Sequence, residues 1–182
     1  MTLSEKVQKP NIKLEPLLIV VMGVSGTGKS TLANEFSQRH PFTYLDADSF
    51  HSEQAIQQMS QGIPLTNNQR LPWIKRIYKK LRKYREQNKN CILAYSGLKK
   101  AHRKVIFSSY TNRLGVLLNA DTQLITERFS QRPDHFMSSK LLDNQFSEME
   151  SFDNNEALLN LDVTDSVDDL IKQLQSFISD KT

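Results

Sequence analysis

Mostly apolar runs alternate along this chain with longer segments in which apolar residues recur every third or fourth position. The runs lie at residues 17–22, 42–45, 91–95, 114–118 and 158–163. Such runs are typical of strands buried on both faces of a parallel sheet. The periodic segments predict helices at residues 30–38, 52–60, 72–88, 99–107, 122–129, 138–149 and 167–179. Strands that alternate with helices indicate a doubly wound α/β fold with a mainly parallel sheet of five strands.

Prolines and polar stretches set the boundaries of these elements. Residues 1–15 are polar and contain lysines, so they predict a flexible tail that precedes one domain at residues 16–182. Pro41 ends the first helix, because the residue before a proline disfavours helical geometry. Pro72 suits the first turn of the long helix 72–88, where a missing backbone N–H costs nothing.

Composition narrows the class of protein further. The 182 residues are 38% hydrophobic and 24% charged, which is typical of a globular chain, and the net charge of +4 favours an anionic ligand without indicating nucleic acid. A single cysteine, Cys91, excludes an intrachain disulfide and favours a cytoplasmic location. The longest apolar run is far shorter than the roughly 20 residues that span a bilayer, so we expect no membrane partner.

A glycine-rich motif follows the first apolar run directly. Residues 23–30 match the phosphate-loop pattern Gly-x4-Gly-Lys-Ser. Small residues let backbone N–H groups point at phosphate oxygens, and the following helix adds its positive N-terminal end. A plain glycine turn would leave the Lys-Ser pair unexplained. The residues expected to bind nucleotide are Gly23, Val24, Ser25, Gly26, Thr27, Gly28, Lys29, Ser30 and Thr31.

The motif and the chain length together favour a small-molecule kinase. Lys29 can reach the β- and γ-phosphates, and the Ser30 hydroxyl can bind Mg²⁺. The chain has no Asn-Lys-x-Asp motif for guanine recognition, and it is too short for the two such domains of a helicase core. We therefore expect a nucleotide and Mg²⁺ as ligands.

Two carboxylates end the second predicted strand. Asp46 and Asp48 lie two residues apart, so both side chains point to the same side of the backbone, toward the crevice above the sheet. One carboxylate can hold the Mg²⁺ shell, and the other can accept the proton of an attacking hydroxyl. A solvated turn with a helix-capping role is the structural alternative for either residue.

Cationic side chains follow at several points where they could reach the same crevice. Arg70 suits an anionic substrate, or equally the start of a helix with Trp73 packed beside it. Lys99 follows the third strand. Arg128, Arg132 and His135 lie in a polar stretch that is either an arginine-bearing lid or a solvated basic turn.

Eight basic residues lie between positions 75 and 89, against a single acidic one. A role in RNA binding is one interpretation of this run. The solvated face of an amphipathic helix is the other, and the apolar residues at helical spacing favour it.

At this point the sequence resembles the gluconate kinases, small P-loop kinases that phosphorylate D-gluconate with ATP. The resemblance runs from about residue 18 to the C-terminus. Its specific blocks are residues 22–31, Asp46-Ala-Asp48 with His51, Met59–Leu65, Arg70-Leu-Pro-Trp73, Ser96–Lys100 with Arg103, Arg128-x3-Arg132-x2-His135, Leu141-Leu142 and Gln145-Phe146. The blocks around Arg70 and around His135 are far more particular than the phosphate loop.

The resemblance implies a nucleoside-kinase-like three-layer fold, a helical lid near residues 128–140, and transfer to the 6-hydroxyl of gluconate. It implies that Asp48 is the base on the substrate side and Asp46 the carboxylate on the magnesium side. Lys99 and Arg103 resemble anion contacts, and Arg128 and Arg132 resemble lid arginines over the phosphates. His51 and His135 match positions in the family, and the resemblance also suggests a homodimer.

Several positions depart from the family's usual pattern, mostly on the acceptor side, and they include Ala55, Gln58, Asn67 and Gln69. Tyr95 and Gly97 stand in place of a usual Cys and Ala, and a usual proline is replaced near Ser151. Ala55 and Gln58 replace a usual Asn and Lys, while Asn67 and Gln69 stand where acidic residues are usual. These departures keep two alternatives open. One is a kinase of the same fold for another hydroxylated acid or polyol, and the other is a nucleotide-binding protein that has lost catalysis.

Overall fold

The computed structural model describes residues 15–131, 139–156 and 158–180. Within these ranges the strands are β1 (Leu17–Met22), β2 (Thr43–Asp46), β3 (Cys91–Ala94), β4 (Asn112–Asn119) and β5 (Leu158–Asp162). They form one sheet in the order β2-β3-β1-β4-β5, and every neighbouring pair is parallel. The prediction of a mainly parallel, five-stranded sheet is therefore confirmed.

Strand β1 lies at the centre of the sheet because both of its faces are apolar. Leu17, Ile19 and Val21 pack into the core on one face of the sheet. The alternate residues Leu18, Val20 and Met22 pack into the core on the other face. Every residue of β1 is buried, as the uninterrupted apolar run predicts for a strand with no solvent-facing side.

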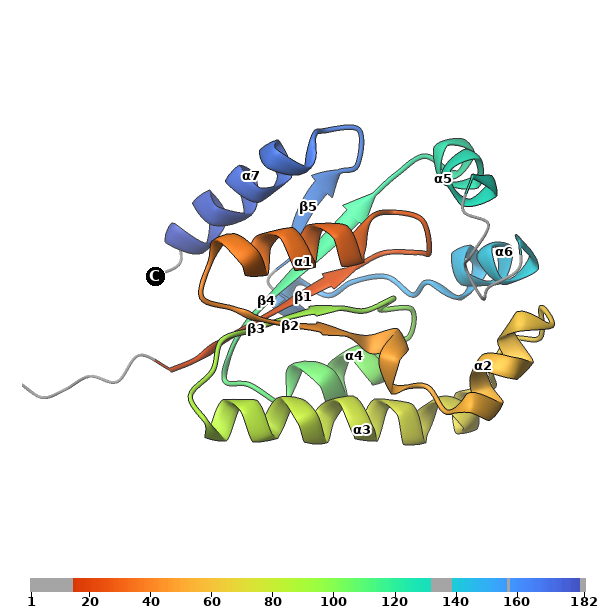
Figure 1. Ribbon diagram of the computed structural model, residues 1–182, viewed down its shortest axis with the longest axis horizontal. Coiled ribbons are helices and arrows are strands. Elements are labelled where there is room, and N and C mark those ends of the chain that lie inside the picture. The colour runs from red at the N-terminus through yellow and green to blue at the C-terminus, as the bar shows by residue number, and fades with distance from the viewer. Residues whose placement is uncertain (1–14, 132–138, 157, 181–182) are drawn as a thin grey trace, which may run out of the picture.

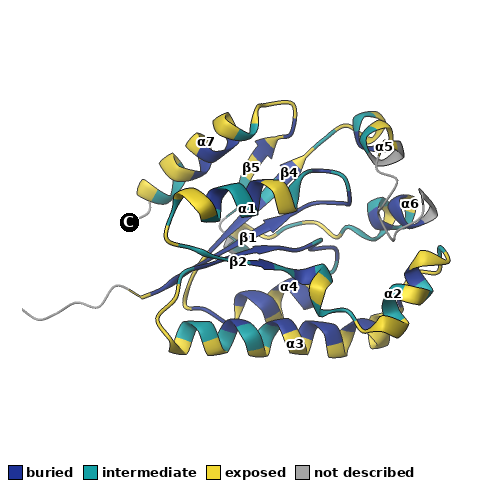
Figure 2. Cartoon of the chain, viewed as in Figure 1, coloured by how far each residue is buried: buried dark blue, intermediate teal, exposed yellow. Residues whose placement is uncertain are grey.

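Helices cover both faces of the sheet and make a three-layer molecule (Figure 1). Helices α1 (Lys29–Arg39) and α7 (Val167–Ser179) pack on one face. Helices α3 (Asn67–Glu86) and α4 (Lys100–Phe107) pack on the opposite face. The exposed sides of these helices lie on the outside of the molecule in Figure 2. No helix in the described ranges combines the length and the apolar character needed to cross a membrane.

Three shorter helices lie beyond the carboxyl ends of the strands (Figure 1). They are α2 (Glu53–Ser60), α5 (Thr122–Ser130) and α6 (Ser139–Glu148), and two 3-10 turns, η1 (Ala47–Phe50) and η2 (Asn154–Glu156), complete the fold. Small apolar clusters hold them there. Val24 packs with Ile125 of α5 and Leu142 of α6, while Met59 of α2 packs with Leu141 of α6. This end of the sheet is where α/β proteins bind ligands.

The predicted start of the long helix at Pro72 is wrong. Helix α3 begins five residues earlier, because Thr66 caps it and forms a capping box with Gln69. Pro72 lies inside the helix on its exposed side, where solvent can satisfy the carbonyl that loses its partner. The basic residues of α3 mostly face solvent, while Trp73, Ile74, Ile77 and Leu81 are buried. This arrangement agrees with the interpretation of the basic run as a solvated face.

Candidate active site

The phosphate loop joins β1 to α1 in a conformation that only glycine adopts easily. Gly23, Gly26 and Gly28 all have positive φ angles, and Gly28 forms the left-handed N-cap of α1 at φ 93°. A Cβ atom on Gly23 would lie 2.8 Å from Thr27 Oγ1 and 3.1 Å from the carbonyl oxygen of Leu118. The glycines of the motif are therefore required by backbone geometry as well as by phosphate binding.

Hydrogen bonds hold the loop in shape. The carbonyl of Val24 accepts from Thr27 Oγ1 and from Lys29 Nζ, each at 2.9 Å. The lysine is thus folded over its own loop, within reach of the space above it. The backbone N–H of Ser25 donates to Gln145 Oε1 of α6 at 2.7 Å. Helix α6 therefore contacts the phosphate loop directly.

Asp46 ends β2, and its two carboxylate oxygens make separate contacts. Its Oδ1 accepts from the backbone N–H of Asp48 at 2.9 Å, and so it caps the η1 turn. Its Oδ2 accepts from Ser30 Oγ at 2.9 Å and from the Tyr44 hydroxyl at 3.0 Å. The structure brings Ser30 and Asp46 together, as required of two oxygen ligands for one Mg²⁺ ion.

Asp48 lies one turn further on, facing the cleft. Its side chain is 43% exposed, and the partial burial of the carboxyl group raises its pKa to about 6, an effect that nearby Lys29 partly offsets and Asp46 reinforces. A carboxylate with a raised pKa is a better proton acceptor near neutral pH than an ordinary aspartate. Its position and its pKa both suit a general base.

His51 is held beside Asp48 by an aromatic stack. Its ring lies 4.2 Å from the ring of Trp73 at an interplanar angle of 17°, and its Nε2 is 4.0 Å from Asp48 Oδ1. Trp73 is fixed in turn, because its indole N–H donates to the Ala47 carbonyl at 2.6 Å. Burial, with Arg76 and Arg70 nearby, lowers the pKa of His51 to about 4. The imidazole is therefore neutral at physiological pH.

Arg70 lies in the first turns of α3 and faces the cleft. Its side chain is only 10% exposed and forms an ion pair with Glu148 of α6 through Nη2 at 2.6 Å. Its Nη1 is buried and has no hydrogen-bond partner among the described residues, and the same holds for Nδ1 of His51. A buried polar nitrogen without a partner costs free energy, so both nitrogens are suited to polar groups of a ligand.

One cleft of about 870 Å³, open mouth included, unites most of the predicted site residues. The predicted residues that line it are Ser25, Gly26, Gly28, Lys29, Ser30, Thr31, Asp46, Asp48, His51 and Arg70. Trp73, Tyr95, Ser96 and Leu98 close its far wall, and α6 contributes Leu141, Asn144 and Gln145.

A second hollow lies against the other side of the phosphate loop. Gly26, Thr27 and Thr31 line it together with Arg128 of α5 and the segment 163–167 that follows β5. Arg128 Nη2 donates to the Val163 carbonyl at 3.0 Å, which ties α5 to this segment. The loop residues Gly26, Gly28 and Thr31 thus line both this hollow and the cleft.

The structure places two predicted site residues, Lys99 and Arg103, outside the cleft. Arg103 was expected to contact an anion, but its guanidinium is fully buried and all three of its nitrogens donate to protein acceptors. Lys99 does not line the cleft either, and its Nζ lies 3.5 Å from Glu150 Oε1. Arg132, His135 and most of the predicted lid at residues 128–140 lie outside the described residues, so these remain predictions.

Sequence reasoning missed the contribution of α6. Gln145 was quoted for the family resemblance, yet nothing in the sequence placed it against Ser25, 120 residues away. Glu148 was not singled out, because a glutamate near a helix end gives no signal of a partner at Arg70. Both contacts depend on how α6 packs against Val24 of the phosphate loop and Ile125 of α5.

Among the positions that depart from the family pattern, Tyr95 lines this cleft, while Ala55, Gln58 and Gln69 line a neighbouring hollow that shares Trp73 with it. Gln58 and Gln69 form a reciprocal pair of amide hydrogen bonds, 2.9 and 3.3 Å long, on the exposed side between α2 and α3. Ala55 lines the shallow hollow behind Trp73, and Asn67 is exposed at the start of α3. None of Ala55, Gln58, Asn67 and Gln69 lines the cleft that holds Asp48 and Lys29.

Comparisons with known proteins agree with this geometry. A family model described as an AAA domain matches residues 18–153. A probable gluconokinase of Dictyostelium discoideum is 33% identical over 187 residues, which cover 97% of this chain and 94% of the relative.

Two solved structures are also similar. A sugar kinase from Janibacter sp. HTCC2649 superposes with a TM-score of 0.85 at 30% identity, covering 90% of this chain and 95% of that one. A gluconokinase from Sinorhizobium meliloti 1021 superposes with a TM-score of 0.79 at 28% identity, covering 91% of this chain and 93% of that one. The fold predicted from the resemblance is confirmed by these neighbours.

Proposed function

This chain belongs to the gluconokinase family of P-loop kinases, and from that premise we propose that it transfers the γ-phosphate of ATP to the 6-hydroxyl of D-gluconate. The observation that carries the proposal is the convergence of three groups on one cleft. Lys29 supplies a cation for the phosphates, Asp48 a carboxylate with a raised pKa, and Arg70 a buried donor that suits a carboxylate.

The phosphate loop and its lysine bind the nucleotide in this proposal. Backbone N–H groups and the N-terminal end of α1 surround the β- and γ-phosphates. Lys29 leaves the Val24 carbonyl and stabilises the negative charge that moves onto the phosphate oxygens during transfer. Arg128 lines the second hollow beside the phosphate loop and stabilises the bound nucleotide there.

Ser30 and Asp46 fit the Mg²⁺ ion that the family implies. Both offer hard oxygen donors, and these lie 2.9 Å apart at the mouth of the phosphate loop. Mg²⁺ is usually held by one or two such protein ligands together with the phosphates of the substrate. When bound, it neutralises charge on the phosphates.

Asp48 acts as the general base. Its carboxylate takes the proton of the 6-hydroxyl as that oxygen attacks the γ-phosphorus. A new O–P bond forms, the bond between the β–γ bridging oxygen and the γ-phosphorus breaks, and ADP leaves. Neutral His51 orients the acceptor beside Asp48 through its buried Nδ1. Arg70 binds the acceptor's carboxylate and so favours a sugar acid over a neutral polyol.

The test is ADP release from Mg·ATP by the purified chain, with and without D-gluconate. We expect strong stimulation by gluconate and formation of 6-phosphogluconate. A panel of other sugar acids and neutral polyols is measured in parallel. Absence of stimulation by gluconate, with ATP binding intact, would overturn the proposal, and stronger stimulation by another acceptor would transfer it to that compound.

We propose a cytoplasmic setting for this reaction, because ATP is the donor and the single thiol, Cys91, is a free buried cysteine. The proposed partners are small molecules only, with neither nucleic acid nor membrane. A homodimer, which the family resemblance suggests, is part of the proposal, and light scattering of the purified protein tests it.

A further inference from the structure

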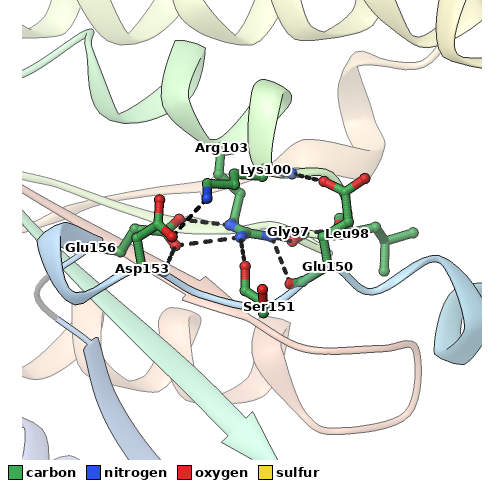
Figure 3. A network of polar contacts seen from close by, with 8 residues as sticks. All are labelled: Gly97, Leu98, Lys100, Arg103, Glu150, Ser151, Asp153 and Glu156. Carbon is green, nitrogen blue, oxygen red and sulfur yellow. Dashed lines mark hydrogen bonds and ion pairs between the residues drawn. The ribbon is translucent and has the colours of Figure 1, made fainter.

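Arg103 is a fully buried cation that the phosphotransfer reaction does not use. It lies on α4 beneath the loop that follows β3, and its guanidinium is saturated by backbone carbonyls and one carboxylate (Figure 3). The face of Phe152 lies 4.1 Å from its central carbon. Its acceptors are the carbonyls of Gly97, Leu98, Glu150 and Ser151 and the carboxylate of Glu156.

These acceptors belong to two segments that are far apart in the sequence. One is the loop 96–99, whose residues Ser96 and Leu98 line the cleft. The other is residues 148–156, which we call the acceptor strap and which leads from α6 toward β5. Arg103 reaches Glu156 at 2.6 Å, Ser151 at 2.6 Å and Gly97 at 2.7 Å, so it fastens the strap to the loop.

A second set of bonds fixes the start of the strap. The backbone N–H of Glu150 donates to the Leu98 carbonyl at 2.8 Å. Its carboxylate accepts from the backbone N–H of Lys100, at the N-terminus of α4, at 2.7 Å. This bond, followed by the charge of Lys99, lowers the pKa of the Glu150 carboxyl group. The strap is therefore anchored only two residues away from Glu148.

Glu148 in turn contacts the arginine that faces the cleft. Its Oε2 lies 2.6 Å from Arg70 Nη2, as a charge contact outside the geometry of an aligned hydrogen bond. Nη1 of the same guanidinium is buried and has no hydrogen-bond partner among the described residues. Glu148 thus contacts Nη2 of Arg70, while Nη1 remains available to bind a ligand.

We propose that Glu148, anchored by Arg103 through the acceptor strap, is a positioning residue that orients Arg70 toward the carboxylate of the acceptor. The inference rests on the proposed function, since it needs an acidic acceptor. Fixing an arginine rotamer in advance lowers the ordering cost of binding. The negative charge of Glu148 acts in the opposite sense, because it repels an anionic acceptor. Positioning and repulsion therefore predict opposite signs for the effect of removing that charge.

The test is steady-state kinetics of the full chain carrying Glu148→Gln, with gluconate and ATP varied separately. We expect the gluconate KM to rise about 3- to 10-fold, the cost of ordering one arginine side chain, with kcat and the ATP KM unchanged. A lower or unaltered gluconate KM overturns the inference. The matched control is Glu35→Gln, which removes a carboxylate paired with Arg39 at 3.3 Å on the surface of α1. It should leave all three constants unchanged.

The role of Arg103 is tested by Arg103→Lys, alone and combined with Glu148→Gln. Lysine cannot reach all of the acceptors, so we expect a higher gluconate KM in the single variant and less than the sum of both effects in the double variant. If the two changes in gluconate KM are additive, Arg103 and Glu148 act independently, and Arg103 does not anchor Glu148. Should Arg103→Lys fail to fold, Glu148→Gln still decides the inference. If the unaltered chain does not use gluconate, the proposed function fails first and the inference fails with it.

Discussion

The two sides of the cleft are built in different ways. The phosphate side comes from one continuous stretch, residues 23–31, in which backbone groups and a single lysine face the space proposed for the phosphates. The acceptor side comes from separate segments: Asp48 and His51 after β2, Arg70 and Trp73 on α3, the loop after β3, and α6. Its side chains are held by partners far away in sequence, such as Glu148 for Arg70 and Ala47 for Trp73.

This difference explains why a P-loop in a sequence indicates the phosphate donor, a nucleotide, more readily than the molecule that accepts the phosphate. Backbone geometry at glycine positions depends on local sequence, so the phosphate site is complete within one motif. The acceptor site depends on side-chain orientation, which packing between elements decides. Variants on the two sides should therefore separate into those that change ATP binding and those that change acceptor use.

The largest expected effect is that of Asp48→Asn. The amide keeps the shape of the side chain but cannot take a proton, so we expect kcat to fall about 100- to 10,000-fold. The affinity for Mg·ATP, measured by calorimetry, should stay near that of the unaltered chain. Lys29→Ala should lose turnover and weaken ATP binding as well. Wild-type turnover in Asp48→Asn would contradict the assignment of the base.

Arg70→Gln should act on the acceptor alone. Loss of a charged hydrogen bond of about 1.5–3 kcal/mol should raise the gluconate KM roughly 10- to 150-fold, with the ATP KM unchanged. Competition assays with glucitol, the neutral polyol, provide the control, because its weak binding should be nearly unaffected. If gluconate and glucitol lose affinity equally, Arg70 does not bind the carboxylate of gluconate.

The pH dependence sharpens the role of Asp48 further. Since burial raises its pKa to about 6, kcat/KM for gluconate should fall below pH 6, approaching about tenfold per pH unit. His51, with its pKa lowered to about 4, should not contribute to this decline. A pH–rate profile of the unaltered chain tests the prediction, and a profile that is flat from pH 7 to pH 5 would reject it.

The same pKa predicts a change in stability. A raised pKa means that the folded chain binds the proton more tightly than the unfolded chain, so ionised Asp48 destabilises the fold above pH 6. Because 43% of the side chain is exposed and solvent screens part of this effect, Asp48→Asn should raise Tm at pH 7 only slightly. The gain should disappear below about pH 4, where the carboxyl is protonated in both states. Thermal unfolding of both proteins between pH 4 and pH 7 measures this difference in Tm.

The smallest effect is expected at the Gln58–Gln69 pair. Gln58→Lys combined with Gln69→Glu replaces the amide pair by an ion pair on the exposed side of α2 and α3. An exposed pair contributes little, so we expect a change in stability below about 1 kcal/mol and a gluconate KM within about twofold of the unaltered value. A marked change of acceptor preference would show that these positions reach the substrate after all.

Much of the fold was predictable because its signals are local. The apolar run of β1 and the helical period of α7 place these elements as they are found. The start of α3 was predicted wrongly. Pro72 suggested a first turn, whereas the capping box of Thr66 and Gln69 sets the boundary earlier. Two valid local rules competed there, and a pair of hydrogen bonds at the cap outweighed the preference of proline for a first turn.

The sequence by itself determined the phosphate loop, the paired aspartates and the parallel sheet, because each depends on neighbouring residues and on backbone periodicity. Only the tertiary structure decided the roles of the arginines. Arg70 and Arg103 both belong to conspicuous blocks, yet Arg70 faces the cleft with an unpartnered nitrogen while Arg103 is saturated in the interior. The function of a guanidinium depends on which acceptors surround it, and the packing of distant segments brings those acceptors together.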